Sequence, residues 1–407
     1  MNFGKTIPPA GAPLTAGDLL RGLRGLSRRA GFRSLEHEIG EYFGVDTVFP
    51  VSSGKAALVL ILKGLAALRA RKKVVIPAYT CYSVPSAIVK AGLDIALCDV
   101  EPDTLDFDYP QLERVADDDT LCVVATHLFG IPSDVERIRR ICAGRDIFVV
   151  EDAAQAMGVR RDDGRFLGTA GDVGFFSLGR GKNITCGNGG IVLTSSPRIS
   201  ASVGKGYLGL TAEPPIATLR GIAEAVLMKV FLHPSLYWLP KGLPFLGIGE
   251  TRFDPAFPTS RLGGFRTGLL ARWKERMAVY NGQRAANGAH YTDALGLRGG
   301  WAIHSRPTPY LRFPLYAKSP GDRIEACSRF GSLGVNGMYP DSVNRIERLR
   351  GRFAACRYPG AEWIAARLVT LPTHALLSRG DRERICRAIE GYCGRKLAPS
   401  CRTQEGR

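Results

Sequence analysis

Two acidic residues and a lysine follow two apolar stretches in the middle of the chain. The first stretch ends in Glu151 and Asp152, and the second, from Val173 to Leu178, is followed by Lys182. Such runs are typical of buried parallel strands, and ligands bind at the carboxyl ends of such strands. A carboxylate and an amine at that edge suit pyridoxal phosphate, which needs a lysine for its Schiff base and an acid against its pyridine nitrogen.

Glycines surround the lysine, at positions 179, 181, 187, 189 and 190. Because glycine lets backbone amides approach a phosphate or a ring closely, we expect this loop to take part in cofactor binding. Side chains alternate along a strand, so only one of Glu151 and Asp152 can face the site. We assign that position to Asp152.

A second candidate segment precedes the helix expected over 58–68. Ser52, Ser53, Gly54 and Lys55 would open this helix, whose free amides and dipole attract an anion. A nucleotide-binding P-loop does not fit, because Ala56 stands where Ser or Thr is required. The segment therefore predicts an anion site that is not a P-loop.

Four blocks between 151 and 190 resemble the DegT-type (DnrJ/StrS) sugar aminotransferases. They are Glu151-Asp152-Ala-Ala-Gln155, Gly171-Asp172, Phe176-Ser177 with Lys182 five residues on, and Gly187-x-Gly-Gly190. Four blocks in this order over about forty residues are far more specific than a lone glycine motif. The resemblance covers roughly residues 35–395 and is densest between 50 and 195.

This resemblance implies a pyridoxal-phosphate aminotransferase of fold type I. It would convert a keto-sugar, nucleotide-linked, to an amino-sugar with glutamate as the amino donor. Lys182 would form the Schiff base and carry protons, and Asp152 would pair with the pyridine nitrogen. Gln155 would lie against the ring hydroxyl of the cofactor.

The resemblance also implies the remaining cofactor contacts. Ser177 would hold the phosphate together with Gly54 and Lys55. Cys81 and Tyr82 stand where the family places an aromatic residue against the cofactor ring. For the tyrosine, packing without a cofactor role is the alternative.

The chain departs from the family pattern at several positions. Lys55 stands in place of a threonine, Cys81 in place of an aromatic residue and Met157 in place of a histidine. Thr259-Ser260-Arg261 replaces Asn-x-Arg in the loop of the second subunit, so only Arg261 carries over. The changes at 157 and 259–261 concern the substrate more than the cofactor.

Strand and helix patterns alternate over much of the chain and predict an α/β fold with a mostly parallel doubly wound sheet, seven-stranded by resemblance. We expect an N-terminal arm and helix over 1–35 and a large cofactor-binding domain over 36–260. A connector helix and a small α+β domain would follow over 261–398, with a disordered tail over 399–407. His127 ends one predicted strand, where a structural role is favoured over a catalytic one.

Composition limits the partners. The 407 residues carry a formal net charge of +17 and are 45% hydrophobic, which allows large cores and attraction to acidic substrates or an anionic surface. Basic residues are dispersed and accompany no nucleic-acid-binding motif, so nucleic acid is not an expected partner. The ten cysteines show no metal-ligand spacing, and we expect reduced thiols in a cytoplasmic protein without a metal site.

An apolar stretch over 222–249 interrupts the large domain. Three prolines and two lysines within it argue against a spanning helix, which needs about 20 apolar residues. It could hold Tyr237 and Trp238 at the inner membrane face, where the enzyme would act on a lipid-linked or other amphiphilic keto acceptor. It could equally be a hairpin buried in the domain or at a dimer interface.

Two expectations concern assembly and activity. By resemblance the chain forms a homodimer whose active sites are completed by the partner, with Arg261 crossing over. A non-catalytic cofactor-binding regulator or scaffold is an alternative of another class, which the changes at 55, 81 and 157 keep open. The presence of Lys182 argues against the lysine-lacking sugar dehydratases related to this family.

Overall fold

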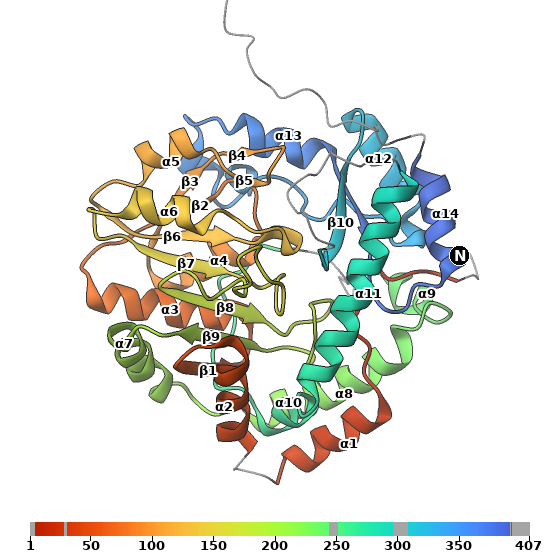
Figure 1. The fold of residues 1–407 in the computed structure, drawn as a ribbon, viewed down its shortest axis with the longest axis horizontal. Helices are drawn as coiled ribbons and strands as arrows, with labels where there is room; N and C mark the ends of the chain where they lie inside the picture. Colours follow the sequence, from red (N-terminus) through yellow and green to blue (C-terminus); the bar gives the residue numbers. More distant parts are fainter. Residues whose placement is uncertain (1–4, 28–30, 244–250, 296–307, 391, 393–407) are drawn as a thin grey trace, which may run out of the picture.

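The computed structural model describes residues 5–27, 31–243, 251–295, 308–390 and 392. A seven-stranded sheet in the order β1-β9-β8-β7-β6-β2-β3 forms its centre (Figure 1). The strands are β1 (Thr47–Val51), β2 (Lys73–Pro77), β3 (Asp94–Cys98), β6 (Thr120–Thr126), β7 (Phe148–Asp152), β8 (Val173–Ser177) and β9 (Gly190–Thr194). Only the pairings of β9 are antiparallel, so the predicted mostly parallel sheet is confirmed.

Helices cover both faces of this sheet. One face carries α3 (Gly54–Leu68), α4 (Ser83–Ala91) and α7 (Pro197–Leu208), and the other carries α2 (Gly31–Phe43), α5 (Tyr109–Val115) and α6 (Val135–Cys142). On β7, Val150 faces the first layer and Val149 the second. Because both faces are buried, the strands are continuous apolar runs in the sequence.

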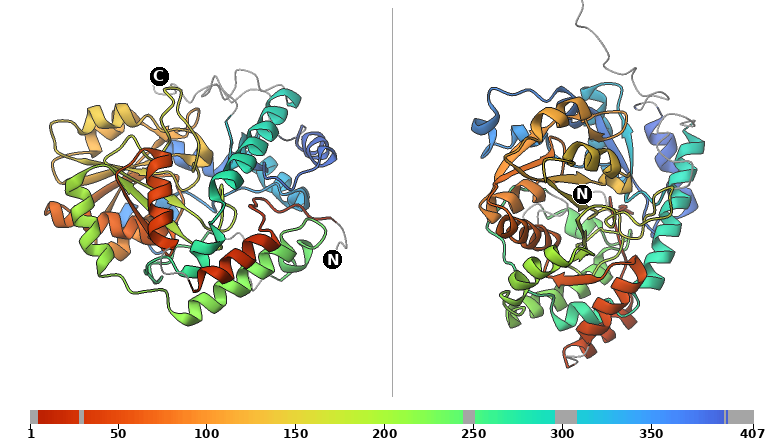
Figure 2. Two further views of the ribbon diagram at one scale, coloured as in Figure 1. Left: turned by 60° about the horizontal axis from the view of Figure 1, so that its bottom comes forward. Right: turned by 60° about the vertical axis from the view of Figure 1, so that its left-hand side comes forward.

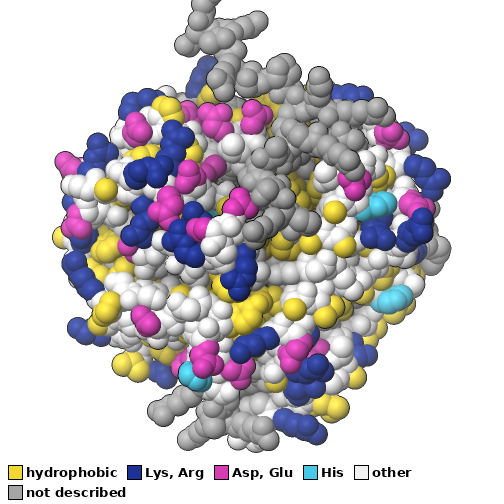
Figure 3. Space-filling model, in the orientation of Figure 1, with side chains coloured by type: hydrophobic (Ala, Val, Ile, Leu, Met, Phe, Trp, Pro, Cys, Tyr) yellow, Lys and Arg dark blue, Asp and Glu magenta, His cyan; other side chains and the backbone are white. Residues whose placement is uncertain are grey.

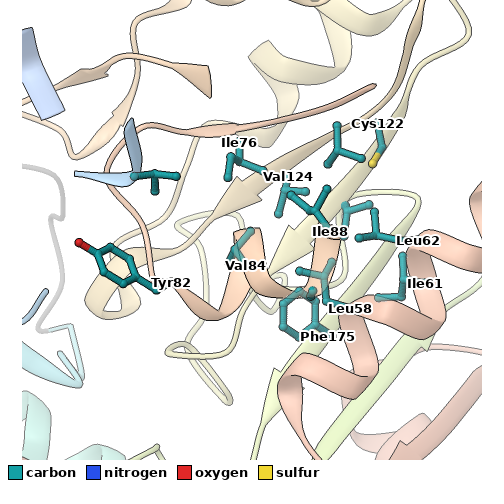
Figure 4. Packing of buried hydrophobic residues seen from close by; sticks show 14 of the residues in the cluster. Leu58, Ile61, Leu62, Ile76, Tyr82, Val84, Ile88, Cys122, Val124 and Phe175 are labelled. Carbon is teal, nitrogen blue, oxygen red and sulfur yellow. The ribbon is translucent and has the colours of Figure 1, made fainter. Parts of the chain in front are cut away.

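The layer formed by α3 and α4 makes the largest core. Figure 4 shows Leu58, Ile61 and Leu62 of α3 and Ile88 of α4 packed toward Phe175 of β8. Helix α3 is apolar on most sides because α4, α7 and the sheet all contact it. This packing holds the N-terminus of α3 rigidly at the carboxyl edge of the sheet.

Five helices lie outside the sheet layers, namely α1 (Ala16–Gly25), α8 (Pro215–Phe231), α9 (Trp238–Lys241), α10 (Gly264–Leu269) and α11 (Trp273–Ala294). Helix α11 corresponds to the predicted connector and runs from α10 to the C-terminal part of the chain (Figure 1). No helix in the described ranges is both long and apolar enough to cross a membrane. Basic side chains are interleaved with acidic ones over the face in Figure 3, as their dispersed sequence positions predict.

The C-terminal part combines a small sheet with helices. Strands β10 (Arg312–Tyr316) and β11 (Leu368–Pro372) pair antiparallel beside α12 (Pro320–Arg329), α13 (Pro359–Arg367) and α14 (Arg379–Ile389). The remaining short elements are β4 (Val100–Glu101), β5 (Asp106–Phe107), η1 (Leu128–Gly130), η3 (Gly331–Leu333), η4 (Val343–Arg345) and η5 (Arg350–Phe353). The strand expected over 301–304 and the tail over 399–407 lie outside the described residues, and the domain limits at 35 and 260 stay predictions.

The N-terminal arm, residues 5–14, packs against the rest of the chain. Thr6 N donates to Pro234 O at 2.8 Å, and Lys5 pairs with Asp381 of α14 at 2.6 Å. The side chain of Ile7 is fully buried. The arm thus ties the α8–α9 region to the C-terminal sheet.

Candidate active site

Lys182 and Asp152 lie close enough for each charge to influence the pKa of the other. Asp152 ends β7 and is nearly buried, and burial raises its pKa against the opposing effects of the Ala154 amide and the Lys182 charge. Burial lowers the pKa of Lys182, while the Cys81 and Asp152 side chains oppose the change. The side chain of Lys182 is surrounded by protein atoms, but part of its surface remains accessible. Both residues therefore lie near each other at the carboxyl edge of the sheet, and we call the space that they border the hollow.

One oxygen of the Asp152 carboxylate is available to a ligand. Its Oδ1 accepts a hydrogen bond from Ala154 N at 3.0 Å, whereas Oδ2 has no hydrogen bond to any described residue. The hydroxyl of nearby Thr80 is also buried without a hydrogen-bond partner in this part of the chain. Buried polar groups are normally satisfied, so these atoms indicate a site for a polar molecule.

A cradle for an anion is formed where α3 begins beside β8. A Cβ added to Gly54 would lie 2.9 Å from Ser177 Cβ, so glycine lets the Ser177 hydroxyl approach the first turn of α3. Gly190 is needed for a similar reason, because its Cβ would lie 2.3 Å from Ser53 O. Ser53 caps the helix by accepting from Ala56 N at 3.0 Å. The amides of Gly54 and Lys55 have no hydrogen-bond acceptor among the described residues and so could bind an anion.

Lys55 directs its ammonium group toward an aromatic ring. Its Nζ lies 4.2 Å from the centroid of the Phe257 ring, and Lys90 Nζ lies 4.9 Å from the same centroid. Phe257 is buried between the two cations. The backbone of Lys55 belongs to the cradle, while a phosphate contact by its side chain stays a prediction.

Gln155 is held rigidly by the protein. Its Oε1 accepts from Phe129 N at 3.0 Å, and its Nε2 donates to the Tyr339 hydroxyl at 2.8 Å. The Tyr339 ring in turn lies 5.4 Å from the ring of Tyr79. Both ends of the Gln155 amide are therefore engaged, and the predicted contact with the ring hydroxyl of the cofactor would have to form in addition to these two hydrogen bonds.

The two neighbouring candidates Cys81 and Tyr82 differ in their surroundings. Cys81 is half-buried, and its charge would influence both Lys182 and Tyr339, so it borders the hollow. The Tyr82 hydroxyl donates to Asp341 O at 3.0 Å, and its ring belongs to the α3–α4 core (Figure 4). The structure therefore brings Cys81 to the site and gives Tyr82 a packing role besides any contact with a cofactor.

His127 and Glu151 form a buried pair with a structural role, as favoured from the sequence. Ser133 N donates to His127 Nδ1 at 3.1 Å, so the ring proton lies on Nε2, which donates to Glu151 Oε2 at 2.8 Å. Glu151 also accepts from Gly168 N at 2.9 Å and Gly171 N at 2.5 Å. Burial alone would raise the pKa of Glu151, but these bonds outweigh it and lower the pKa.

Arg261 and Met157 are engaged elsewhere in the single chain. The Arg261 guanidinium donates to Leu208 O at 2.7 Å and lies over the Tyr207 ring. Met157 is buried in the core that contains Trp273. A role for Arg261 in a partner's site is a prediction that a single chain does not test.

The comparisons with known proteins agree with this geometry. Residues 26–205 match the model of the DegT/DnrJ/EryC1/StrS aminotransferase family. The matched region, which we call the DegT-family region, includes Gly54, Asp152, Ser177 and Lys182, and the resemblance stated from the motifs is confirmed over it.

Two curated relatives match part of the chain. GDP-perosamine synthase of Vibrio cholerae is 30% identical over 161 residues, which are 40% of this chain and 43% of that protein. L-glutamine:2-deoxy-scyllo-inosose aminotransferase of Streptomyces kanamyceticus is 31% identical over 165 residues, 40% of this chain and 38% of that protein. The chain therefore matches less than half the length of these relatives.

Solved structures match the fold over nearly the whole chain. PseC of Helicobacter pylori, an aminotransferase involved in pseudoaminic acid biosynthesis, superposes with a TM-score of 0.76 at 14% identity, covering 95% of this chain and 98% of that one. The sugar aminotransferase CalS13 of Micromonospora echinospora gives 0.75 at 23% identity, covering 95% and 99%. The predicted fold class is thereby confirmed.

Sequence reasoning missed how the lysine loop is held in the DegT-family region. Three largely buried arginines of α10 and α11 donate to its carbonyl oxygens: Arg266 to Cys186 O and Asn188 O, Arg276 to Thr185 O, and Arg284 to Lys182 O and Asn183 O. Arg284 also donates to Gly11 O of the N-terminal arm at 3.0 Å. In a sequence such arginines are indistinguishable from surface residues, because only their contacts show that they are buried.

Arg284→Met should lower the free energy of unfolding by about 2–4 kcal/mol, because three buried carbonyl oxygens lose their donor while the chain keeps a long side chain. Urea denaturation of the purified protein measures this difference. Arg272→Met, at an exposed position just before α11, is the matched control and should lower the free energy of unfolding much less. Equal costs for the two variants would contradict the expectation.

Proposed function

We propose that the chain is a pyridoxal-phosphate-dependent aminotransferase that converts the keto group of a nucleotide-linked sugar to an amine, with glutamate as donor. The observation that supports the proposal is that Lys182 and Asp152 lie near enough for each charge to act on the other, while Ser177 lies close to the first turn of α3. The match of residues 26–205 to an aminotransferase family supports the reaction, and the relative named GDP-perosamine synthase supports a nucleotide-linked sugar.

The residues around the hollow fit this cofactor. The cradle formed by Gly54, Lys55 and Ser177 offers a hydroxyl and helix amides for a phosphate. The free Oδ2 of Asp152 offers a carboxylate oxygen for a protonated ring nitrogen. Lys182 offers an amine within the same enclosed space.

When bound, the cofactor would supply an electron sink for the carbon from which a proton is removed. Asp152 would hold the proton on the ring nitrogen through its free oxygen. Lys182 would anchor the cofactor through Nζ and, once released, would carry the proton taken from the donor Cα. Because burial lowers the Lys182 pKa, more of this amine is neutral at a given pH, which is the form that accepts a proton.

Absorption spectroscopy of the holoenzyme tests the proposal. Glutamate should convert the visible band of the lysine-bound cofactor to the near-ultraviolet band of its amine form, and a keto-sugar nucleotide should restore the visible band. L-glutamine belongs in the donor panel, because one relative is named for that donor. A holoenzyme whose spectrum responds to no donor would instead favour the non-catalytic regulator or scaffold.

We further propose a homodimer in which Arg261 completes the partner's site. Arg261 is half-buried, but its bond to Leu208 O lies at the surface, which supports this role because the guanidinium can be turned toward another subunit. Sedimentation should show a dimer, and an active monomer at assay concentration would contradict it. Mixing inactive Lys182→Ala and Arg261→Ala chains, with exchange of subunits, should restore about a quarter of the activity, since half the dimers would hold one intact site.

A second candidate partner is an anionic membrane at the cytoplasmic face. Helices α1 and α8 lie side by side (Figure 2), and each exposes apolar side chains. The stripe residues are Ile216, Leu219, Val226, Leu227 and Val230 on α8, Leu20 and Leu23 on α1, and Leu26 directly after α1. Exposed Arg24, Arg220 and Lys229 flank these stripes, and apolar insertion together with basic attraction gives reversible binding.

The structure changes which residues of 222–249 could meet this membrane. Tyr237 is buried, which agrees with the alternative of a segment packed in the domain at this residue, whereas Leu236, Leu239 and Leu243 are exposed. Phe245 and Leu246 lie outside the described residues. A cytoplasmic location is supported by the cysteines of the described ranges, all eight of which are free thiols.

Flotation with anionic vesicles at low and high salt tests the membrane proposal. Wild type should float at low salt, and a Leu219→Ser/Leu227→Ser variant should not. The matched control is Val279→Ser/Ile324→Ser, two equally exposed apolar residues away from the stripe, which should still float. If wild type stayed at the bottom of the gradient, the proposal that the protein acts on an amphiphilic acceptor at the membrane would lose its support.

A further inference from the structure

A half-buried arginine beside the hollow lacks an anionic partner. Arg312 begins β10 between the buried residues Leu311 and Phe313. Its one hydrogen bond to a described residue, from Nη1 to Asn336 Oδ1, is long at 3.4 Å, and the same oxygen accepts from Met338 N at 2.6 Å. A guanidinium carries five N–H donors, so most of the donors of Arg312 have no acceptor among the described residues.

No acidic side chain of the described residues forms an ion pair with Arg312. The preceding segment, residues 296–307, contains neither Asp nor Glu. Burial lowers the pKa of the Arg312 guanidinium to about 10, which still leaves it charged at neutral pH. Burying an unpaired cation is costly, and a site of this kind is completed by an anion.

Arg312 faces the same hollow as Lys182. Leu311 N, next to it, donates to Phe129 O at 2.9 Å, and Phe129 N donates to Gln155. The charge of Arg312 acts on the pKa of Lys182, and the phenols of Tyr237 and Tyr339 act on the pKa of Arg312. The strand thus brings a cation near Lys182.

We propose that Arg312 binds the carboxylate of the amino donor, an inference that rests on the proposed function. The planar guanidinium matches a carboxylate with two parallel hydrogen bonds. In an amino acid the carboxylate is attached to the same carbon as the reacting amine, so a cation near Lys182 can reach it. The phosphates of a nucleotide-linked sugar are separated from the keto carbon by the sugar ring, and the cofactor phosphate has its own cradle at Gly54.

Tyr237 forms part of the same subsite. It is buried, and both Arg312 and Arg180 lower its pKa against the larger, opposite effect of burial. Its phenol therefore lies near the charge of Arg312 and can donate to the same anion. This places one end of the apolar stretch 222–249 at the donor site.

The test uses holoenzyme carrying Arg312→Gln or Arg312→Lys, with Arg379→Gln as a control that removes the same charge from an exposed position on α14. Single-turnover spectra with L-glutamate give an apparent dissociation constant and a limiting rate. Calorimetry with glutarate, a dicarboxylate that has no amine to react, gives binding without turnover. Inorganic pyrophosphate is the phosphate probe in the same assay.

Arg312→Gln should weaken the binding of glutamate and of glutarate about 10- to 100-fold while its limiting rate and cofactor spectrum change much less. Arg312→Lys should recover part of the loss, and Arg379→Gln should match wild type. The inference would be overturned if Arg312→Gln bound glutamate and glutarate as tightly as wild type. It would also be overturned if wild type bound no glutarate, or if Arg312→Gln lost binding of pyrophosphate alone. Failure of the proposed function differs, since there wild type itself shows no spectral response to any donor.

Discussion

Lys182→Ala is expected to lower transamination by at least about 1,000-fold and to remove the visible absorption of the lysine-bound cofactor. The amine would serve as both anchor and proton carrier, and no other group with a free amine faces Asp152 among the described residues. The fold should survive, because the loop is held mainly through its carbonyl oxygens by the arginines of α10 and α11. Activity, absorption spectra and urea denaturation of the same preparation separate these effects.

The control for this variant is Lys205→Ala, which removes an exposed lysine from α7 and should behave as wild type. Borohydride reduction of the wild-type holoenzyme followed by peptide mapping should place the cofactor on the Lys182 peptide. If Lys182→Ala kept its visible band and turnover, another lysine would hold the cofactor. Lys55 would then be the first to examine, since it also lies near Cys81.

Asp152→Asn is expected to slow the glutamate half-reaction by about 100-fold or more while the cofactor stays bound. The amide is neutral and cannot hold a proton on the ring nitrogen, whereas the cradle at Gly54 and Ser177 is unchanged. Rapid-mixing spectra of the holoenzyme measure the rate. The control is Asp172→Asn, whose side chain accepts from Val149 N outside the hollow and should change the rate little.

Asp152→Asn should also change the pKa of Lys182 in a defined direction. The Asp152 charge raises the pKa of Lys182 and thereby opposes burial, which lowers it. Removing that charge should lower the Lys182 pKa further, so the apoprotein variant should attach cofactor efficiently at lower pH than wild type. If the midpoint pH of cofactor attachment moved upward in the variant, or if the half-reaction rate were unchanged, the partner of the ring nitrogen would be a residue other than Asp152.

The predicted elements agree with the structure where local patterns carry the information. Buried parallel strands are apolar on both faces, so β2, β6 and β7 are recognisable as runs of β-branched and other apolar residues. The alternation of Glu151 and Asp152 follows from strand geometry alone, and the two carboxylates do differ in their partners as expected. The pattern left Tyr237 undecided, because an apolar sequence does not show whether a ring faces membrane or protein, and the structure buries this ring.

The chemistry proposed for this protein comes from the sequence by itself: the order of the blocks around Asp152, Ser177 and Lys182 predicts an acid, an anion cradle and an amine at the edge of a parallel sheet. Only the tertiary structure decided what surrounds them. The arginines that hold the lysine loop and the Arg312 guanidinium come from α10, α11 and β10, about 80 to 160 residues away along the chain, and no local pattern distinguishes a buried arginine from an exposed one. Burial and pairing are properties of long-range contacts, which form only when the chain is folded.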